Sequence, residues 1–293
     1  MLFGSPSMYA ELKGVIVKRP AEAYGDQAQA AAQWQPLNYL AEPDLAGAAA
    51  QHAEFVRLVA QFGAEVCYAP AAPGTGLDSV YVHDPLIVSR RGAILGNMGK
   101  PARTAEPAAL AAYLRGLGVP VLGAVTGAGR LEGGDVAWVD ERTVAVGEGY
   151  RTNAEGIRQL RTLLSDQVDE VVAVPLPHWT GPADCLHLQS NFSVVDRDLA
   201  VVYSRLLTVP FREWLLGRGF QFVEVPDEEY ASMGCNVLAL GPRQCVMVAG
   251  NPVTQARLEA AGARVWTFRG DEICLKGAGG PTCLTRPFWR EAA

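Results

Sequence analysis

Hydrophobic positions along the chain recur as pairs of short apolar runs, and a short polar turn separates the two runs of each pair. This pattern predicts β-hairpins, because apolar runs of this length form buried strands and polar or glycine-containing turns reverse the chain. The four pairs occupy residues 85–97, 135–149, 192–204 and 236–250. We therefore expect a succession of hairpins rather than isolated strands.

Each predicted hairpin is followed by a stretch with helical spacing and then by one more apolar run. The helical stretches are residues 106–118, 153–167, 210–220 and 252–263, and the apolar runs are residues 119–125, 170–177, 221–226 and 263–268. Pro107, Pro210 and Pro252 lie at or near the predicted helix starts, where a missing N–H costs nothing. The chain thus repeats a ββαβ unit.

The N-terminal part contains a looser fifth unit, with a strand at 14–20, a helix at 44–63 and a strand at 64–70. Residues 272–277 are expected to pair beside the first of these strands and to close a ring. Five such units without an additional layer predict an α/β propeller with pseudo-fivefold symmetry, formed as one domain over residues 1–293. The alternative is a doubly wound α/β sheet, which would not need a hairpin in every unit.

Composition excludes several classes of protein. The chain has 293 residues, of which 49% are hydrophobic and 19% charged, as in globular proteins. Its formal net charge is −6 and no basic run stands out, so we expect no nucleic-acid partner. No apolar run is long enough to span a membrane, and the N-terminal residues do not resemble a signal peptide. We therefore expect no membrane partner.

The six cysteines are spread through the chain and include no CxxC pair, which argues against a zinc site or a thioredoxin-like motif. Free thiols fit a reducing compartment, so we predict a cytoplasmic protein with no metal and no other cofactor. Cys185, Cys235, Cys245 and Cys274 are expected to be small buried hydrophobes, although Cys185 is close enough in sequence to His187 to be an alternative thiol.

Polar residues with chemical potential gather just before the first strand of successive units. Equivalent positions of a ring converge on its axis, so these side chains are expected to surround one central pocket. They are Asp78 and Asp84, Glu132 and Asp135, His187, Cys235 and Asn236, and finally Cys283.

Cys283 lies in the stretch GAGGPTCLT, where glycine and proline leave little room for regular structure and the thiol is presented rather than packed. A thiol with an imidazole provides a nucleophile and a base. Carboxylates beside them suit a planar delocalised cation, because guanidinium matches a carboxylate in a bidentate fork. The predicted substrate is therefore a small cation that carries a guanidino or amidino group.

The sequence resembles the guanidino-modifying enzymes of the pentein superfamily, which are the dimethylarginine dimethylaminohydrolases, arginine deiminases and amidinotransferases. The resemblance extends over residues 77–287 and rests on five motifs in order: LDSVYVHD, LEGGDV, GYRTNAEG, HLQS and GGPTCLTRP. It implies the pentein fold, a five-bladed α/β propeller. RTNAEG is most similar to the dimethylargininases, so the implied activity is hydrolysis of an arginine derivative to a ureido product and an amine.

The resemblance also implies roles for single residues. Cys283 is the nucleophile that forms a covalent S-alkylthiouronium, and His187 is the general acid and base. Glu132 and Asp84 hold the guanidinium, Asp78 lines the site, and Arg151 grips the substrate carboxylate. Asp135 either orients His187 or accepts a hydrogen bond within a turn.

Two positions depart from the family pattern. Gln189 stands where arginine deiminases have an aspartate and dimethylargininases a lysine, which argues against plain arginine deimination. Asn97 lies where dimethylargininases have a second arginine for the substrate carboxylate. Both side chains are expected near the substrate. The alternatives are an amidinotransferase or deiminase of another guanidine, a non-catalytic pentein-fold binding protein, and a redox-sensing thiol protein. A homodimer is compatible with each of them.

Overall fold

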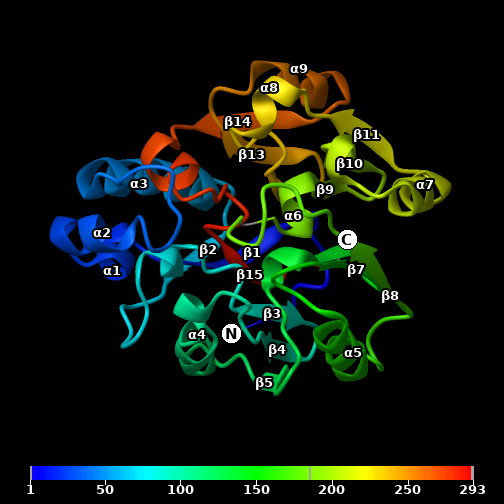
Figure 1. The fold of residues 1–293 in the computed structure, drawn as a ribbon. Helices are drawn as coiled ribbons and strands as arrows, with labels where there is room; N and C mark the ends of the chain where they lie inside the picture. Colours follow the sequence, from blue (N-terminus) through cyan, green and yellow to red (C-terminus); the bar gives the residue numbers. More distant parts are fainter. Residues whose placement is uncertain (1, 185, 292–293) are drawn as a thin grey trace.

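The computed structural model describes residues 2–184 and 186–291, which form five small three-stranded sheets around a common centre (Figure 1). We call each of these five sheets a blade. Four blades each come from one continuous stretch of chain. Their strands are β3 (Leu86–Ser89), β4 (Gly92–Leu95) and β5 (Val121–Ala124); β6 (Val136–Asp140), β7 (Thr143–Glu148) and β8 (Glu170–Pro175); β9 (Phe192–Asp196), β10 (Leu199–Val202) and β11 (Gln221–Glu224); β12 (Leu238–Gly241), β13 (Gln244–Val248) and β14 (Arg264–Phe268). The expected five-bladed α/β propeller is confirmed.

One pairing rule holds in each of these four blades. The first strand runs antiparallel to the middle strand, and the middle strand runs parallel to the third. A parallel pair needs a crossover connection, which a helix on the outside of the ring supplies (Figure 1). The crossover helices are α4 (Glu106–Gly116), α5 (Ala154–Leu163), α7 (Val209–Gly217) and α9 (Pro252–Ala260).

The fifth blade joins the two ends of the chain. Its middle strand β1 (Leu12–Val17) runs parallel to β2 (Glu65–Tyr68) and antiparallel to β15 (Arg286–Arg290). The prediction that residues 272–277 would pair with β1 is therefore wrong. Asp271–Leu275 form a helical turn, η5, whose backbone N–H groups at Glu272 and Ile273 donate to Gln51 Oε1.

Proline explains why β15 escaped prediction. Pro287 lies in the middle of the strand, opposite Val15, and a proline cannot donate to a β ladder. It is tolerated because β15 is the edge strand of its sheet. An isolated bridge to Gly4 on the other side of β15 uses the backbone N–H groups of Gly4 and Arg290, so it needs no donor from Pro287. The fifth blade thus obeys the same rule as the others, with its first strand taken from the C-terminal end of the chain.

The crossover of the fifth blade is longer than the others. It contains α1 (Pro20–Tyr24), α2 (Gln27–Gln33) and α3 (Leu45–Gln61), of which only α3 was expected. Asp44 caps α3 by accepting a hydrogen bond from Gly47 N at 2.6 Å. Short helical segments occur at the turns between elements: η1 (Leu77–Val80), η2 (Pro101–Arg103), η3 (Gly133–Asp135), α6 (Leu188–Asn191), η4 (Ser204–Leu206) and α8 (Asp227–Tyr230).

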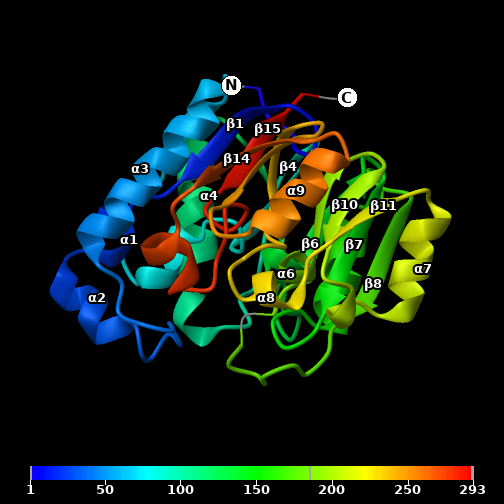
Figure 2. The same cartoon turned by 90° about the horizontal axis from the view of Figure 1, so that it is seen from above.

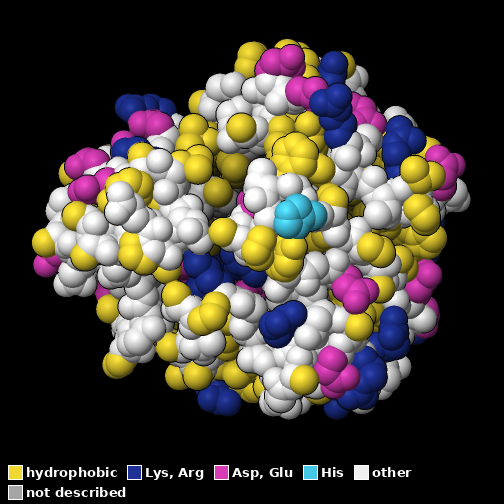
Figure 3. Space-filling model, in the orientation of Figure 1, with side chains coloured by type: hydrophobic (Ala, Val, Ile, Leu, Met, Phe, Trp, Pro, Cys, Tyr) yellow, Lys and Arg dark blue, Asp and Glu magenta, His cyan; other side chains and the backbone are white. Residues whose placement is uncertain are grey.

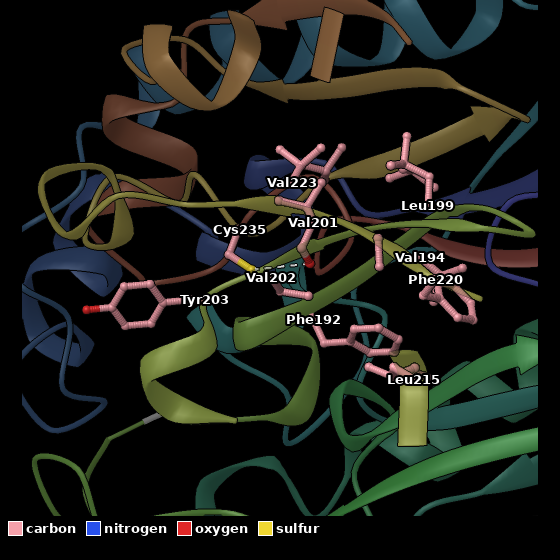
Figure 4. Close-up of a cluster of buried hydrophobic side chains, with 14 of the residues drawn as sticks. Phe192, Val194, Leu199, Val201, Val202, Tyr203, Leu215, Phe220, Val223 and Cys235 are labelled. Carbon is pink, nitrogen blue, oxygen red and sulfur yellow. Dashed lines mark hydrogen bonds between the residues drawn. The ribbon is translucent and has the colours of Figure 1, made fainter. Parts of the chain in front are cut away.

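The apolar core lies between the blades and their helices. Figure 4 shows one such cluster, in which Phe192 of β9 and Val201 of β10 pack with Leu215 of α7. Cys235 belongs to this cluster, and its Sγ lies 3.7 Å from the carbonyl oxygen of Val201. Because the first and middle strands of the blades are buried at most positions, their apolar runs are continuous rather than alternating, whereas the third strands are partly exposed.

The ends of the chain lie on one side of the propeller, and α6 and α8 lie on the other (Figure 2). Within the described residues, the helices are too short or too polar to cross a bilayer.

Candidate active site

The turns that lead into the first strand of each blade supply the polar side chains of the hub. Asp84 precedes β3, Glu132 and Asp135 precede β6, His187 precedes β9, Asn236 precedes β12, and Cys283 precedes β15. The pairing of β15 with β1 therefore gives Cys283 the same place in its blade as the acids and the imidazole have in theirs. We use hub for this set of turns.

Glu132 and His187 form the centre of the site. His187 Nε2 and Glu132 Oε2 share a hydrogen bond of 2.8 Å, and both side chains are buried. The other carboxylate oxygen, Oε1, accepts from the backbone N–H groups of Gly99 at 2.9 Å and Lys100 at 3.1 Å. Burial opposes ionisation of Glu132, but His187 and Arg151 outweigh it and hold its pKa below the usual range. The carboxylate is therefore fixed and charged.

Asp84 faces the other nitrogen of the same imidazole. Its Oδ1 lies 3.7 Å from His187 Nδ1, and its Oδ2 accepts from Arg103 Nη1 at 2.5 Å. Burial opposes ionisation, yet the Arg103 and His187 charges hold the pKa of Asp84 well below its usual range. Asp84 Oδ1 is buried and has no hydrogen-bond partner among the described residues.

The glycines of LEGGDV allow these groups to meet. A Cβ on Gly134 would lie 2.4 Å from His187 Nδ1 and 2.8 Å from Asp84 Oδ1. A Cβ on Gly133 would lie 2.3 Å from the carbonyl oxygen of His83. Backbone without side chains is thus needed where the Glu132 turn passes between the imidazole and the Asp84 turn.

Asp135 and Gln189 fasten the turns around His187. Asp135 Oδ1 accepts from Leu188 N at 2.9 Å, the peptide directly after His187. Gln189 Nε2 donates to Gly133 O at 3.1 Å and Val136 O at 2.7 Å. Burial raises the pKa of Asp135 to about 6. Asp135 thus accepts a turn hydrogen bond that also positions the imidazole, while a role for Gln189 toward substrate stays a prediction.

Three further predicted residues lie around this centre. Asp78 pairs with Lys100 Nζ at 2.6 Å, and Arg151 Nη1 donates to Glu132 Oε2 at 3.0 Å. Asn97 Nδ2 donates to the carbonyl oxygens of Gly127 and Gly129, so this side chain anchors the loop that leads to Glu132. The predicted contacts of Arg151 and Asn97 with a substrate tail are not tested by these hydrogen bonds.

The thiol of Cys283 is half-buried, whereas the thiols of Cys67, Cys235, Cys245 and Cys274 are buried. Asn236 Nδ2 lies 3.4 Å from Cys283 Sγ, and His83 N donates to Cys283 O at 3.2 Å. The Cys283 turn therefore touches the Asp84 turn, which touches the glycines beneath His187. Burial raises the pKa of Cys245 to about 12, which keeps that thiol protonated. Cys185 lies outside the described residues.

Sequence reasoning missed Arg103, the cation that pairs with Asp84 and Glu106. Arg103 is buried, donates to Asp84 and Tyr81 O, and binds both carboxylate oxygens of Glu106. Arg103 lies six residues after Asn97, in the same connection between β4 and α4.

Asp84, Glu132 and His187 offer ligand atoms within 4.8 Å of one another, a spacing that also suits a metal ion. Arg103 and Arg151 already place positive charge on the two carboxylates, so a metal would have to compete with both. The expected absence of a metal stays a prediction.

A pocket of 280 Å³ lies beside the hub and is lined by Leu37, Gly76, Asp78, Ala102 and Glu106, among others. On the face that carries α6, basic and acidic side chains are visible in a recess near the middle, next to apolar side chains around a histidine (Figure 3). Charged side chains are thus exposed in a recess of this face.

Comparison with known proteins agrees with this geometry. The model of a family described as arginine deiminase matches residues 78–214 and 207–290. The chain is 26% identical to an N(G),N(G)-dimethylarginine dimethylaminohydrolase of Pseudomonas aeruginosa over 277 residues, which cover 94% of this chain and 99% of that protein. It is 34% identical to a dimethylarginine dimethylaminohydrolase of Streptomyces coelicolor over 185 residues, which cover 63% and 65% of the two chains.

Solved structures share the fold. The dimethylarginine dimethylaminohydrolase of Pseudomonas aeruginosa complexed with citrulline superposes with a TM-score of 0.76 at 24% identity, covering 95% of this chain and 100% of that one. An amidinotransferase of Microseira wollei superposes with a TM-score of 0.80 at 16% identity, covering 99% and 98%. The pentein fold implied by the sequence is confirmed, and the chain belongs to the arginine deiminase family of the pentein superfamily.

Proposed function

We propose that this chain is a cysteine hydrolase of a guanidino substrate, in which Cys283 is the nucleophile and His187 the general acid and base. The products are a ureido compound and an amine. Relatives of the chain are named dimethylarginine dimethylaminohydrolase and arginine deiminase, and both names denote hydrolysis of a guanidino C–N bond. An arginine derivative such as dimethylarginine is the proposed substrate.

The proposal rests on the burial, charge and missing hydrogen bond of the Asp84 carboxylate. The carboxylate is buried and charged, and its Oδ1 lacks a hydrogen-bond partner among the described residues. A buried charged oxygen without a donor is costly, so such an atom calls for an explanation. A guanidinium N–H would supply both the hydrogen bond and the positive charge. Glu132, which contacts His187 and Arg151, places a second charged carboxylate beside the same imidazole.

The first half of the reaction forms the covalent intermediate. The Cys283 thiolate attacks the central guanidino carbon and forms a C–S bond, and the C–N bond to the leaving amine breaks. His187 gives that amine its proton, while Glu132 holds the imidazole at 2.8 Å and stabilises its charged form. The product of this half is the S-alkylthiouronium and a free amine.

The second half consumes water. The same imidazole, now neutral, takes a proton from a water molecule that attacks the thiouronium carbon, and the C–S bond breaks to return the thiolate. The ureido oxygen comes from this water. If an amine attacked instead, the outcome would be amidino transfer, so amidinotransferase activity is the competing proposal.

A substrate panel tests the function. The protein is incubated with arginine, methylated arginines, agmatine and guanidino acids, and the ureido product, ammonia and methylamines are quantified. We expect a ureido product in equal amount to the amine, and none from Cys283→Ser. Retained turnover in the serine variant, or no turnover on any guanidine by the parent, would overturn the proposal.

A further inference from the structure

The turn that leads into β15 contains Gly280, Thr282 and Cys283, and we call it the thiol turn. The side chain of Asn236 contacts two consecutive residues of this turn. Its Oδ1 accepts from Thr282 N at 3.0 Å, and its Nδ2 lies 3.4 Å from Cys283 Sγ. The backbone N–H of Thr282 can only donate, so it fixes which end of the amide faces it. The NH₂ group must therefore face the sulfur, which makes the sulfur the acceptor.

The amide is held in this place from several sides. Asn236 is buried, with 4% of its surface exposed, and its backbone N–H donates to the carbonyl oxygen of Met233 at 3.0 Å. A Cβ on Gly280 would lie 2.5 Å from Asn236 Cγ, so the thiol turn approaches the amide as closely as backbone allows. The contact with sulfur is thus preorganised rather than incidental to a mobile surface side chain.

The Asn236 amide carries no net charge, which suits its position beside the sulfur of Cys283. Reactive thiols are commonly activated by a neighbouring lysine, arginine or protonated histidine. Such a cation against the sulfur would repel a guanidinium that must approach the same atom. Arg286 and Cys274 also interact electrostatically with Cys283, but the group in hydrogen-bond contact with the sulfur is a neutral amide. An amide donor stabilises negative sulfur without repelling the cationic substrate.

We propose that Asn236 is a catalytic residue that donates a hydrogen bond to the reacting sulfur of Cys283 and thereby favours the thiolate. This inference rests on the proposed function, in which Cys283 is the nucleophile. It predicts that thiolate formation at Cys283 depends on the Asn236 donor even without substrate.

Asn236→Asp removes the hydrogen-bond donor to the sulfur and keeps the contact with Thr282. An aspartate retains an oxygen for Thr282 N–H but replaces the NH₂ by a second, negatively charged oxygen beside the sulfur. The rate of iodoacetamide labelling at Cys283 is followed by peptide mass spectrometry as a function of pH. We expect its midpoint to rise by about one pH unit or more, and kcat/KM at neutral pH to fall about tenfold or more.

Gly280→Ala tests the same contact without changing the amide. The added methyl would displace Asn236 from the sulfur, so the midpoint should rise as in the aspartate variant. Gly217→Ala is the matched control, because a Cβ there meets no atom within 4 Å and Gly217 lies at the end of α7. Its labelling profile and activity should equal those of the parent.

The labelling profile does not require turnover, so it distinguishes the two proposals. Turnover by a variant without the Cys283 thiol would remove the proposed function. A folded Asn236→Asp protein with the parent's midpoint would overturn the role of Asn236 alone. If that variant does not fold, the Gly280→Ala profile decides, and an unchanged midpoint there overturns the inference equally.

Discussion

The hub has two sides that are built from different kinds of contact. The imidazole side, formed by Asp84, Glu132 and His187, is dense in charge and buried. Its carboxylates are paired with Arg103 and Arg151. The thiol side, formed by Asn236, Gly280 and Cys283, has a half-buried sulfur with a neutral amide beside it.

The difference shows how the proposed chemistry is divided. On the imidazole side the charges are set before substrate arrives, because buried ion pairs and backbone N–H groups fix them in place. Such preorganised groups need no rearrangement when charge develops in the reaction. On the thiol side a neutral amide contacts the sulfur, and in the proposed mechanism a bound guanidinium adds positive charge that stabilises the thiolate. Substitutions on the imidazole side should therefore change both stability and activity.

The largest expected effect comes from His187→Gln. The amide retains a hydrogen-bonding group near Glu132 but can neither protonate the leaving amine nor deprotonate water. We expect kcat/KM to fall by about 10²–10⁴-fold. Labelling of the folded variant should still find Cys283 reactive without substrate, because the Asn236 contact is unchanged. Steady-state kinetics together with the labelling rate check this, and near-normal turnover would remove His187 from the mechanism.

Arg103→Met comes next and should act mainly on stability. It leaves the buried carboxylates of Asp84 and Glu106 without their shared cation, and removal of one partner from a buried ion pair costs about 3–5 kcal/mol. Denaturant unfolding measures the loss. Arg142→Met is the matched control, since Arg142 pairs with Asp169 on the exposed surface. Equal midpoints for the two variants would show that Arg103 does not hold the imidazole side together.

Asp135→Asn should have the smallest effect, visible as a change in pH dependence. The pKa of Asp135 is raised from 3.8 to about 6 by burial, so between these values the folded protein keeps a proton that the unfolded chain releases. This group therefore makes stability fall as pH rises through that window, and its contribution is constant above it. Asparagine can still accept from Leu188 N, so the variant should lose that part of the slope. Unfolding midpoints between pH 4 and pH 7 measure it, and an unchanged slope would contradict the assignment.

Local pattern was enough to predict most elements of the fold. The hairpin at residues 135–149 and the helix that starts after Asn153 are both present, and the Asn153 side chain caps that helix by accepting from Gly156 N. Apolar runs, turn residues and capping side chains act over a few positions, so the sequence displays them directly. The order of polar residues before each first strand also indicated the turns that form the hub, although Cys235 of that set packs in the apolar core.

The partner of β1 was missed because that choice is not local. The apolar stretch at residues 272–277 and the proline-containing stretch at 286–290 were both available, and local preference favoured the former. Gln51 of α3 binds the backbone of Glu272 and Ile273 and keeps them helical, while the edge position makes Pro287 harmless. Neither fact is visible in the stretches themselves.

By itself, the sequence determined the repeated ββαβ unit and the turns that carry the polar side chains, because strand, helix and turn preferences depend on near neighbours. Only the tertiary structure decided which charges neutralise one another: Arg103 on Asp84, Arg151 on Glu132, and a neutral amide on the thiol. Those pairings join residues from different turns or blades, and electrostatic contacts depend on distance in space rather than on separation along the chain.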